Sequence, residues 1–463
     1  MRIYNFMLIA SLLPLLAGCT KVRIKSDFAK LQHKAHLATN LSIALDIASC
    51  TNLENLLNTQ DTSDYIISKT EAIRLALLNN PGLQADFQNL GIAKADLVQA
   101  GLYTNPDIKS VFCFATDDRG PGTTQTNIEA MATMRLSDLW QIPLSKHVAE
   151  DVLEIVSLRI LSTILTIVEE TKIAYDTCVI ANLRTQNTEH LLQTARKLQD
   201  EIYYRQGYGY TSDWDKDMSD ARVGVLEAEV KKQEAYVVQA YLTLKQLIGL
   251  TPSTPSIKVV DQFDIALTIP EFEVIEAYAV EHRPELQIAH MKIKQYQDQI
   301  RLEKAKIVKA VDAGIAYKRD FEKPFAGWGP YFNISLPIFD DNYAQIARAE
   351  FLLKQAEQKL IEEKINILAE LHTSYYLLQA LRQEIAQYTT MVLPSQQKAV
   401  DYAYRYAESM QLNMVTAIES EMKFYENTAQ LLENYYHAFK ELAHLERSVG
   451  KDFNLFPVNE SLT

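Results

Sequence analysis

The chain has 463 residues, with 14 glycines, 14 prolines and a formal net charge of −13 from 59 acidic and 46 basic residues. This acidic balance speaks against nucleic acid and anionic membrane surfaces as partners, and by itself it requires no more than solubility. So few glycines and prolines in a chain long enough for two or three ordinary domains predict long, uninterrupted helices.

The first residues form a targeting segment, which takes no part in the fold. Arg2 precedes a short apolar run, Phe6 to Leu16, which ends in Leu16-Ala17-Gly18-Cys19. This tetrapeptide resembles the bacterial lipobox, in which the cysteine thiol receives a diacylglycerol and becomes the mature N-terminus. We therefore expect a signal peptide over residues 1–18, acylation at Cys19 and no other cofactor. The alternative is an uncleaved anchor helix, but it needs about 20 apolar residues, more than this run holds.

Thr20 follows Cys19 at the position where an aspartate would resemble the inner-membrane retention signal, so the outer membrane is favoured. The other cysteines are Cys50, Cys113 and Cys178. They are odd in number and lack CxxC spacing, so they indicate no disulfide framework. We interpret all three as buried, small apolar side chains, and their redox state stays open.

The body of the chain is predicted to begin after a tether. Residues 19–67 form this tether, because Lys21 to Asp64 is polar and shows no stable hydrophobic period. A helix is expected from Ser68, which forms a capping box with Glu71. Asn79-Asn80-Pro81-Gly82 then marks a bend, and a second helical stretch runs to Gly101.

Alternating apolar and polar residues next predict β-strands. The first pair covers 106–115 and 127–138, and a second pair covers 310–318 and 330–338. Each segment is about 9–11 residues long, the length that a tilted strand needs to cross hydrocarbon. One such strand would more often belong to a soluble sheet, whereas four in two matched pairs behind a lipobox favour a membrane barrel.

The loops within the two strand pairs, 116–122 and 319–330, are polar and contain glycine, which suits the exterior tips of a barrel. Aromatic residues gather near the second loop: Phe321, Phe325, Trp328 and Tyr331. They predict part of an aromatic girdle at the membrane surface, with packing of the loop itself as an equal alternative.

A long helix follows each strand pair. No glycine or proline occurs between Ser145 and Tyr204, so a continuous helix of about 60 residues, roughly 90 Å long, is predicted. Apolar residues keep coiled-coil spacing along it, in a seam that Lys172 makes imperfect: Leu158, Leu161, Leu165, Val168, Tyr175 and Val179. The chain turns near Gly209 and returns over Asp215 to Ile248. The first helical hairpin is thus predicted over 143–249.

The second half of the chain repeats this order of elements. Arg283-Pro284-Glu285-Leu286-Gln287 matches Asn80-Pro81-Gly82-Leu83-Gln84 as the opening of a helix. The second hairpin is predicted over 342–449, with Pro394 as a break, a turn near Met410 and a return from Met414. The chain then divides into a first repeat over 68–270, a second repeat over 271–449 and a tail over 450–463.

These motifs, in this order, resemble the lipidated branch of the TolC-type outer-membrane efflux proteins. The resemblance rests on the lipobox, Ala100-Gly101-Leu102-Tyr103-Thr104-Asn105-Pro106 before the first strands, a Gly-x-x-Ser-x-x-Asp turn and the duplication. It covers Ser68 to Val449. The implied fold is mainly α with a membrane β-barrel portion: a homotrimer with a helical tunnel and a shared twelve-stranded barrel, four strands per subunit. Residues 250–267 and the tail would form an equatorial belt.

The chain's own physics agrees with a shared barrel. Four strands leave two bare edges, which hydrocarbon does not tolerate, so closure must come from further copies.

The resemblance also implies site residues. The hairpin turns would contact a periplasmic adaptor through Gly207, Gly209, Ser212, Met410 and Asn413. Met410 stands where the family usually has glycine, and Asn413 where it has serine. Asp215 and Glu419 fall on carboxylates of the periplasmic gate, where a negative ring would favour cations. The alternatives are that Asp215 is a helix N-terminal residue favoured by the dipole and that Glu419 lies on a solvated face.

The gate departs from the family's pattern at two positions. Thr416 replaces a second carboxylate, and Leu412 replaces an arginine that ties the gate shut in some members. How the closed gate is locked stays open, with Arg405 and Arg205 as candidate substitutes.

The predicted function is the exit duct of a tripartite efflux or type I secretion system. It would be a passive conduit across the periplasm and outer membrane, opened by its adaptor and an inner-membrane pump. The cargo (drug, metal or polypeptide) stays open. The alternative is a non-channel coiled-coil lipoprotein that tethers the outer membrane, which leaves the four strands unexplained.

An enzyme is not expected, because the chain has no phosphate loop, nucleophile elbow or metal-spaced cluster. His437 and His444 share a helix face without an acidic or cysteine companion at ligand distance, so we interpret them as packing or surface residues. Met410 and Met414 suggest soft-metal handling less than they suggest packing at a helix tip.

Overall fold

The structure is a computed structural model and describes residues 22–41, 43, 65–113, 127–252, 257–260, 269–320 and 325–453. The chain forms two compact units. Unit 1 draws on 1–30, 88–159 and 287–362, and unit 2 on 31–87, 160–286 and 363–463. Each unit thus takes segments from both halves of the chain, so the units do not follow the boundary of the predicted repeats at 270.

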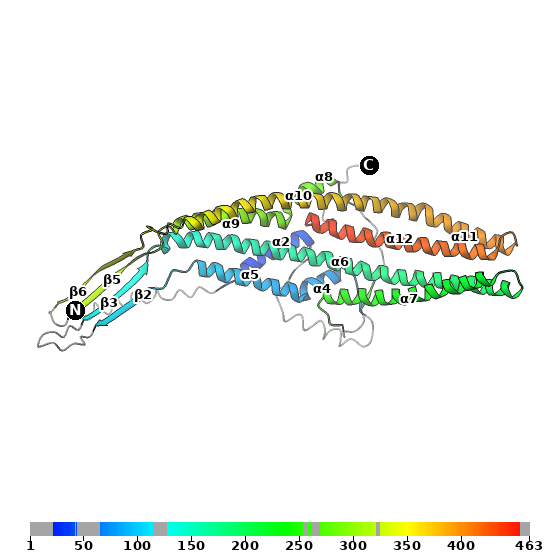
Figure 1. The fold of residues 1–463 in the computed structure, drawn as a ribbon, viewed down its shortest axis with the longest axis horizontal. Helices are drawn as coiled ribbons and strands as arrows, with labels where there is room; N and C mark the ends of the chain where they lie inside the picture. Colours follow the sequence, from blue (N-terminus) through cyan, green and yellow to red (C-terminus); the bar gives the residue numbers. More distant parts are fainter. Residues whose placement is uncertain are drawn as a thin grey trace. The chain divides into compact units, whose positions relative to one another are not determined.

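Unit 1 contains a four-stranded antiparallel sheet (Figure 1). Its order is β2 (Asp107–Cys113), β3 (Asn127–Arg135), β5 (Val311–Asp320) and β6 (Phe325–Ile334). The central pairing of β3 with β5 joins the two predicted strand pairs, with Ala132 opposite Ile315. Within this sheet β2 and β6 are the edge strands, each paired on one side.

The strand boundaries correct two predictions. β3 ends at Arg135 rather than 138, because the amides of Leu136 and Ser137 both turn to the carbonyl of Val311. β6 begins at Phe325 rather than 330, so the predicted loop over 319–330 is wrong. Glycines at 327 and 329 interrupt the alternation and favour a loop in the sequence, although they are paired strand residues. The predicted loop 116–122 and Phe321 lie outside the described residues.

A helix precedes and a helix follows each of the two strand pairs of the sheet. Unit 1 contains most of α5 (Pro81–Ala100), α9 (Pro284–Ala305) and the first parts of α6 (Asp138–Gly207) and α10 (Tyr343–Gln387). The ring N–H of Trp140 donates to the carbonyl of Ala305, and Asn342 donates to that of Glu303. α6 starts at Asp138, before the predicted 143, because Pro143 falls in its second turn and removes only one hydrogen bond there.

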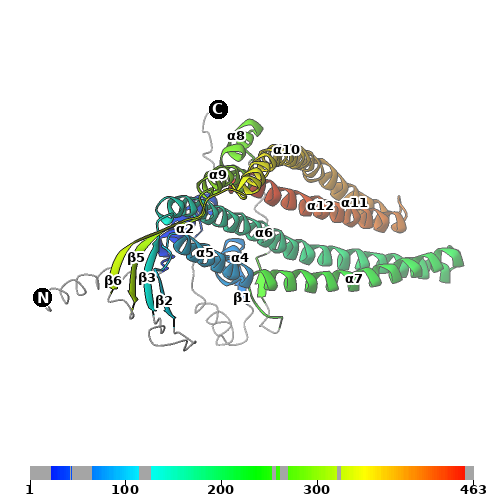
Figure 2. The ribbon, with the colours of Figure 1, turned by 60° about the vertical axis from the view of Figure 1, so that its left-hand side comes forward.

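Unit 2 contains the two helical hairpins (Figure 2). The first is the rest of α6 with α7 (Asp213–Leu247); the second is the rest of α10, a π-helical turn over Tyr388–Val392, α11 (Leu393–Glu408) and α12 (Met414–Val449). The predicted seam of α6 is buried, including Leu158 at its unit 1 end and Val179. Among the described helices, no stretch combines the length and apolarity that crossing a membrane requires.

Short elements complete unit 2. α4 (Lys69–Asn79) begins where predicted, because the hydroxyl of Ser68 accepts the amide hydrogen of Glu71. α8 (Phe272–His282) precedes α9 across Arg283 as α4 precedes α5 across Asn80. β1 (Tyr65–Ile67) and β4 (Ile257–Val259) pair in parallel. Residues 253–256, 261–268 and 454–463, and with them most of the predicted belt, lie outside the described part of the chain.

Pro394 does not break the second hairpin as predicted. The π-helical turn over Tyr388–Val392 leads directly into α11. Proline clashes with the carbonyl four residues before it, and a wider turn relieves that clash. The hydroxyls of Thr389 and Thr390 donate to the carbonyls of Ile385 and Ala386 in the preceding turn. The chain therefore stays helical through Pro394 but changes its hydrogen-bond pattern here.

Part of the predicted tether is a helix, α2 (Lys25–Thr39). Leu31, Ala35 and Ala38 lie on one stripe of it and are buried. Lys94 forms an ion pair with Asp27 at 2.8 Å. The stripe is too narrow to give a hydrophobic period in a polar sequence, so contacts with distant segments, rather than local pattern, specify this helix.

Candidate functional site

The first candidate surface is the sheet, whose two faces differ in chemistry. Cross-strand partners place one set of side chains on a common face that is apolar apart from Ser110 and Arg319: Ile108, Phe112, Ile128, Ala130, Ala132, Met134, Val311, Ala313, Ile315, Tyr317, Ala326, Trp328, Pro330, Phe332 and Ile334. Many of these are exposed in the single chain; Ile108 is 81% exposed and Trp328 79%. The predicted alternation is therefore present in three dimensions.

The other face of the sheet is charged. Lys318 pairs with Glu129 at 2.6 Å, and Arg135 with Asp312 at 3.6 Å, in both cases across the β3–β5 ladder. Phe325 and Tyr331 are also on this face, opposite Asp320 and Gly314, whereas Trp328 is on the apolar face. These three aromatic residues therefore do not share a face, as a girdle at a membrane surface would require.

The first hairpin turn joins α6 to α7 and contains three of the predicted tip residues. Gly207 ends α6, and Gly209 adopts a left-handed conformation with φ of 77°. The amides of Gly209 and Tyr210 donate to the carbonyls of Gln206 and Arg205, which is a Schellman motif. Ser212 then caps α7. The turn is thus held by backbone hydrogen bonds at the end of α6 and by the side-chain cap of Ser212 at the start of α7.

Asp215 completes a capping box with Ser212. The Ser212 hydroxyl accepts the Asp215 amide hydrogen, and an Asp215 carboxylate oxygen accepts from the Ser212 amide at 3.0 Å. Hydrogen bonds from the Ser212 hydroxyl and amide lower the pKa of Asp215. The predicted N-terminal role of this residue is therefore present in the chain, and the carboxylate stays ionised in neutral solution.

The second hairpin turn, between α11 and α12, has the same construction. Met410 adopts φ of 58°, and the amides of Met410 and Gln411 donate to the carbonyls of Ala407 and Tyr406. The Asn413 side chain caps α12 by accepting the amide hydrogen of Val415. Met410 is 94% exposed, and Glu419 lies on the exposed face of the first turns of α12. Met414 packs against the apolar core between the hairpins.

The two hairpins pack together through an apolar core next to these turns. It is formed by Leu192, Ala195, Leu198, Ile202, Val223, Val230, Ile418 and Met422. Glu421 ties the hairpins at its edge, accepting from the hydroxyls of Tyr404 and Thr194 and pairing with Lys197 at 3.5 Å. Burial and the Glu421 carboxylate raise the pKa of Tyr404.

The arginines proposed as substitutes for a gate lock are placed as follows. Arg205 pairs with Glu201, four residues earlier on α6, at 2.7 Å. Arg405 is exposed on α11. Other ion pairs join the two hairpins. Arg184 pairs with Glu433 and Arg222 with Glu426, and Lys197 pairs with Glu421 as described above. These pairs cannot be predicted from the sequence because their partners lie more than 200 residues apart. Arg222 and Glu426, for example, are separated by 204 residues.

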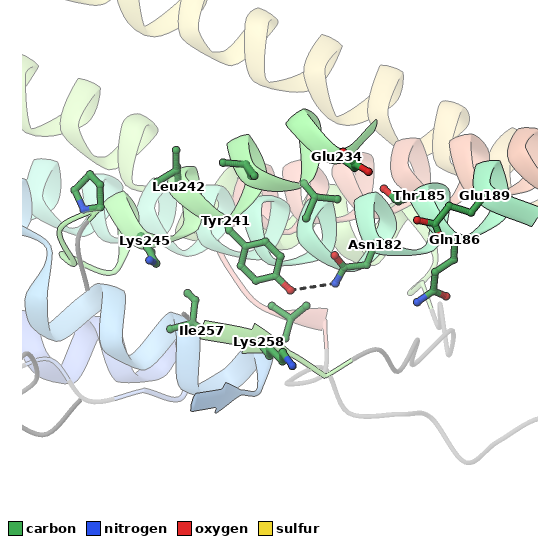
Figure 3. Close-up of a pocket in the computed structure, with 14 residues that line it drawn as sticks. Asn182, Thr185, Gln186, Glu189, Glu234, Tyr241, Leu242, Lys245, Ile257 and Lys258 are labelled. Atoms are coloured by element: carbon green, nitrogen blue, oxygen red, sulfur yellow. Dashed lines mark hydrogen bonds between the residues drawn. The ribbon is translucent and has the colours of Figure 1, made fainter. Parts of the chain in front are cut away.

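A groove of about 800 Å³ lies between α6, α7 and β4 in unit 2 (Figure 3). Tyr241 and Asn182 are joined by a hydrogen bond of 3.0 Å at its wall, and Lys245 and Lys258 also line it. Its floor includes the buried strand residues Ile257 and Val259. None of the predicted site residues lines this groove.

The cysteine predictions have mixed outcomes. Cys178 is buried on α6, and burial raises its pKa to about 12, so its thiol is inert at neutral pH. Cys113 is exposed at the end of β2, so the prediction of burial is wrong for it. It is on the charged face of the edge strand β2. Cys19 and Cys50 lie outside the described residues.

Both histidines on α12 have acidic companions, so that premise of the interpretation is wrong, whereas His437 is a surface residue as predicted. His437 lies 3.0 Å from Glu433, and His444 lies 2.8 Å from Glu169 and 3.3 Å from Glu370. The first pairing has i,i+4 helical spacing and was available from the sequence; the others depend on packing. Within the described residues, no group of three or more histidine, cysteine, aspartate or glutamate side chains is arranged to hold a metal ion.

Solved structures with the same arrangement of helices and strands are known. No protein-family model and no curated protein matches the chain. CusC resembles it with 15% sequence identity and a TM-score of 0.68, over 86% of this chain and 96% of that chain. The outer-membrane channel OprN has 14% identity and a TM-score of 0.69, over 83% and 90%. The Neisseria gonorrhoeae outer-membrane channel MtrE, in its open state, has 15% identity and a TM-score of 0.66, over 83% and 89%.

At these identities the likeness establishes the fold. The matched regions cover nearly the whole length of each neighbour and most of this chain. The chain therefore has the TolC-type fold of outer-membrane channels, as the order of its sequence motifs predicted.

Proposed function

We propose that this chain is the outer-membrane exit duct of a tripartite efflux or type I secretion system. It acts as a passive conduit for small molecules or polypeptides, anchored by acylated Cys19 and opened by a periplasmic adaptor and an inner-membrane pump. It is a homotrimer with a shared twelve-stranded barrel and has no catalytic activity. The fold shared with OprN and MtrE, whose structures are described as outer-membrane channels, favours this assignment.

The sheet supports the membrane part of the proposal and is the observation that carries it. Its apolar face extends over all four strands and includes large, mostly exposed side chains such as Trp328 and Phe332. Its other face carries the ion pairs of Glu129 and Arg135. A face of this kind suits lipid, and the charged face suits a wet lumen. The unpaired edges of β2 and β6 require further strands in hydrocarbon, and copies of this chain supply them.

The outward face of α7 supports association of copies. Exposed residues follow coiled-coil spacing along it; we call this set the outer seam: Trp214, Met218, Ala221, Val225, Ala228, Lys232, Ala235, Gln239 and Leu242. The side of α7 that packs within the chain uses other positions, such as Val223 and Val230. Three alanines in the outer seam allow a second helix to approach closely.

A complementary surface lies on α11. Tyr402 and Tyr406 stack with ring centroids 6.5 Å apart and are both more than half exposed. Large rings on one helix fit between the small residues of another. We therefore place α11 of one copy against the outer seam of the next.

The hairpin turns are the proposed docking region for the adaptor. Gly207, Gly209 and Ser212 form the first turn, and Met410 and Asn413 form the second. Exposed aromatic side chains surround the first turn, with Tyr208 at 67%, Tyr210 at 81% and Trp214 at 68%. Asp215 and Glu419 are the proposed gate carboxylates. In a trimer they would form a ring of six negative charges, which favours cations.

The sheet offers a test with a matched control. Ile315 and Ala316 are neighbours on β5 but face opposite sides. Ile315→Lys puts a cation on the lipid face, which costs about 2–4 kcal/mol at the bilayer midplane, whereas Ala316→Lys puts it in the lumen. We expect purified wild type and Ala316→Lys to sediment as trimers and conduct in planar bilayers. Ile315→Lys should be lost from the outer membrane.

A wild-type chain that sediments as a monomer and gives no conductance would overturn the channel assignment and favour a tether. If the two lysine variants behave alike, the assignment of the faces is wrong even though the channel stands.

A further inference from the structure

A cluster of charged side chains joins four segments of unit 2, and no part of the proposed channel function uses it. We call it the His444 cluster; its members are Glu169 on α6, Arg283 and Glu285 at the junction of α8 and α9, Glu370 on α10, and His444 and Arg447 on α12. Arg283 is nearly enclosed, at 3% exposure, and bridges Glu285 and Glu370 at 3.1 and 2.8 Å.

His444 occupies a bridging position in this cluster. Its Nδ1 lies 2.8 Å from a carboxylate oxygen of Glu169, and its Nε2 lies 3.3 Å from one of Glu370. A neutral imidazole carries a hydrogen on only one ring nitrogen, so it can donate to only one of these carboxylates. The other nitrogen would then point a lone pair at a negative charge. Only the doubly protonated ring satisfies both contacts.

The charges around His444 lead to the same conclusion. Three carboxylates of the cluster, on Glu169, Glu285 and Glu370, face the two guanidinium groups of Arg283 and Arg447. A protonated His444 makes these charges balance. Glu441, one turn earlier on α12, adds a further negative charge near the ring. The next cation along α6, Lys172, is already held by Glu446 and Asp452 at 2.7 and 2.8 Å.

We propose that His444 is a proton-dependent clamp that holds the end of α12 to both α6 and α10. In the protonated state it links Glu169 to Glu370. Deprotonation leaves one ring nitrogen with a lone pair facing a carboxylate and leaves the cluster with an excess of one negative charge. The clamp concerns the folded chain alone, so it holds whether or not the chain conducts.

The electrostatic environment sets the direction of the pH response. The hydrogen bond to Glu169 raises the pKa of His444 above its ordinary value. Partial burial lowers this pKa, but the charges of Glu169, Glu370 and Glu441 raise it further. The stabilisation is therefore complete below the pKa of an unfolded histidine, about 6.5, and is lost as the pH rises through the higher pKa of the folded state. Burial raises the pKa of Glu370, but the charge of Arg283 and hydrogen bonds from Ser448 and Arg283 outweigh it. The pKa of Glu370 is therefore lowered, and its carboxylate stays ionised throughout.

The chain provides a matched control on the same helix. His437 pairs with a single carboxylate, Glu433, and that pairing is between residues of one helical turn. Its protonation does not link α12 to another helix through that contact. His437→Gln should therefore leave the pH response of the α12 end unchanged, while His444→Gln should remove it.

Hydrogen exchange of the full acylated protein tests the clamp, read by mass spectrometry on peptides from the last turns of α12. Rates at pH 5.5 and 8.5 are corrected for intrinsic exchange. In the wild type we expect protection to fall roughly tenfold at the higher pH, the worth of one hydrogen bond to a charged group. His437→Gln should show the same fall, and His444→Gln less than about a twofold change.

A second variant covers the case in which His444→Gln does not assemble. Glu169→Gln keeps an acceptor for Nδ1 but removes its charge, so the loss of protection should occur at lower pH than in the wild type. The clamp is refuted if the wild type shows no pH-dependent change in this segment. It is equally refuted if the change keeps its midpoint in both Glu169→Gln and His444→Gln.

Discussion

The two hairpin turns of unit 2 share one backbone and differ in side chains. Each helix ends in a Schellman motif with a left-handed residue, which is Gly209 in the first turn and Met410 in the second. A left-handed conformation costs a residue other than glycine about 1–2 kcal/mol. Met410 is nearly fully exposed and recovers none of this by packing. The hydrogen bonds of the helix ends, rather than a glycine, therefore determine the turn.

The helices that leave the two turns also start differently. Ser212 and Asp215 bond reciprocally at the start of α7, whereas Asn413 alone caps α12. The first turn thus has a relaxed backbone and a double cap, and the second has a strained backbone and a single cap. We expect the second turn to open locally more often than the first, with consequences for whatever docks there.

The largest expected effect comes from making the first turn resemble the second. Gly209→Val puts a β-branched residue at φ of 77° and should lower the free energy of local opening by about 2 kcal/mol. Met410→Val should cost less, because methionine already bears most of the strain. Amide exchange of the two turns measures both. Equal losses at the two positions would contradict the assigned strain.

Removal of the caps should have the next largest effect. Ser212→Ala removes the acceptor of the Asp215 amide and one donor to its carboxylate, and should cost about 1–2 kcal/mol of local stability. Asn413→Ala removes a single cap and should cost about 0.5–1 kcal/mol. Exchange rates at the first amides of α7 and α12 distinguish the two, and a larger loss at Asn413 would reverse the comparison.

Relief of strain should have a smaller effect of opposite sign. Met410→Gly should stabilise the second turn by about 0.5–1 kcal/mol, since the gain from relaxed geometry exceeds the added flexibility of the unfolded chain. Slower exchange over residues 408–412 is the expected result. If exchange becomes faster, the methionine side chain stabilises the turn by a contact in the assembly.

The smallest effect separates the turns by pH. Hydrogen bonds from Ser212 lower the pKa of Asp215, so its contribution is present in neutral solution and is lost as the pH falls through that lowered value. The second turn has Thr416 at the matching position and should show no such loss. Exchange of α7 amides in acid measures this, with Asp215→Asn as the control that abolishes the pH dependence.

The sequence predicted most of the regular elements because their signals are local. Ser68 caps its helix as expected, Leu158 and Val179 are buried, and the alternating strands present one apolar face. It failed where local rules and packing differ. Glycines at 327 and 329 concealed the start of β6, and Pro394 is accommodated by a wider helical turn.

For the candidate sites, the sequence located the turns but not the contacts that hold them. Gly209 and Asn413 were identified by position, and the structure shows what their backbones and side chains do. Glu421 was not singled out, although it ties the two hairpins together. The i,i+4 spacing of Glu433 and His437 by itself predicts their pairing on one helix.

By itself the sequence determined period, capping and turn chemistry, since hydrogen bonds and hydrophobic spacing within a few residues specify them. Only the tertiary structure decided which charges meet. Lys172 interrupts the predicted coiled-coil register. Packing places it between Glu446 and Asp452, which lie 274 and 280 residues further along the chain. His444 gained two carboxylate partners in the same way. Such pairings depend on helices brought together by burial of their apolar faces, and no local pattern encodes them.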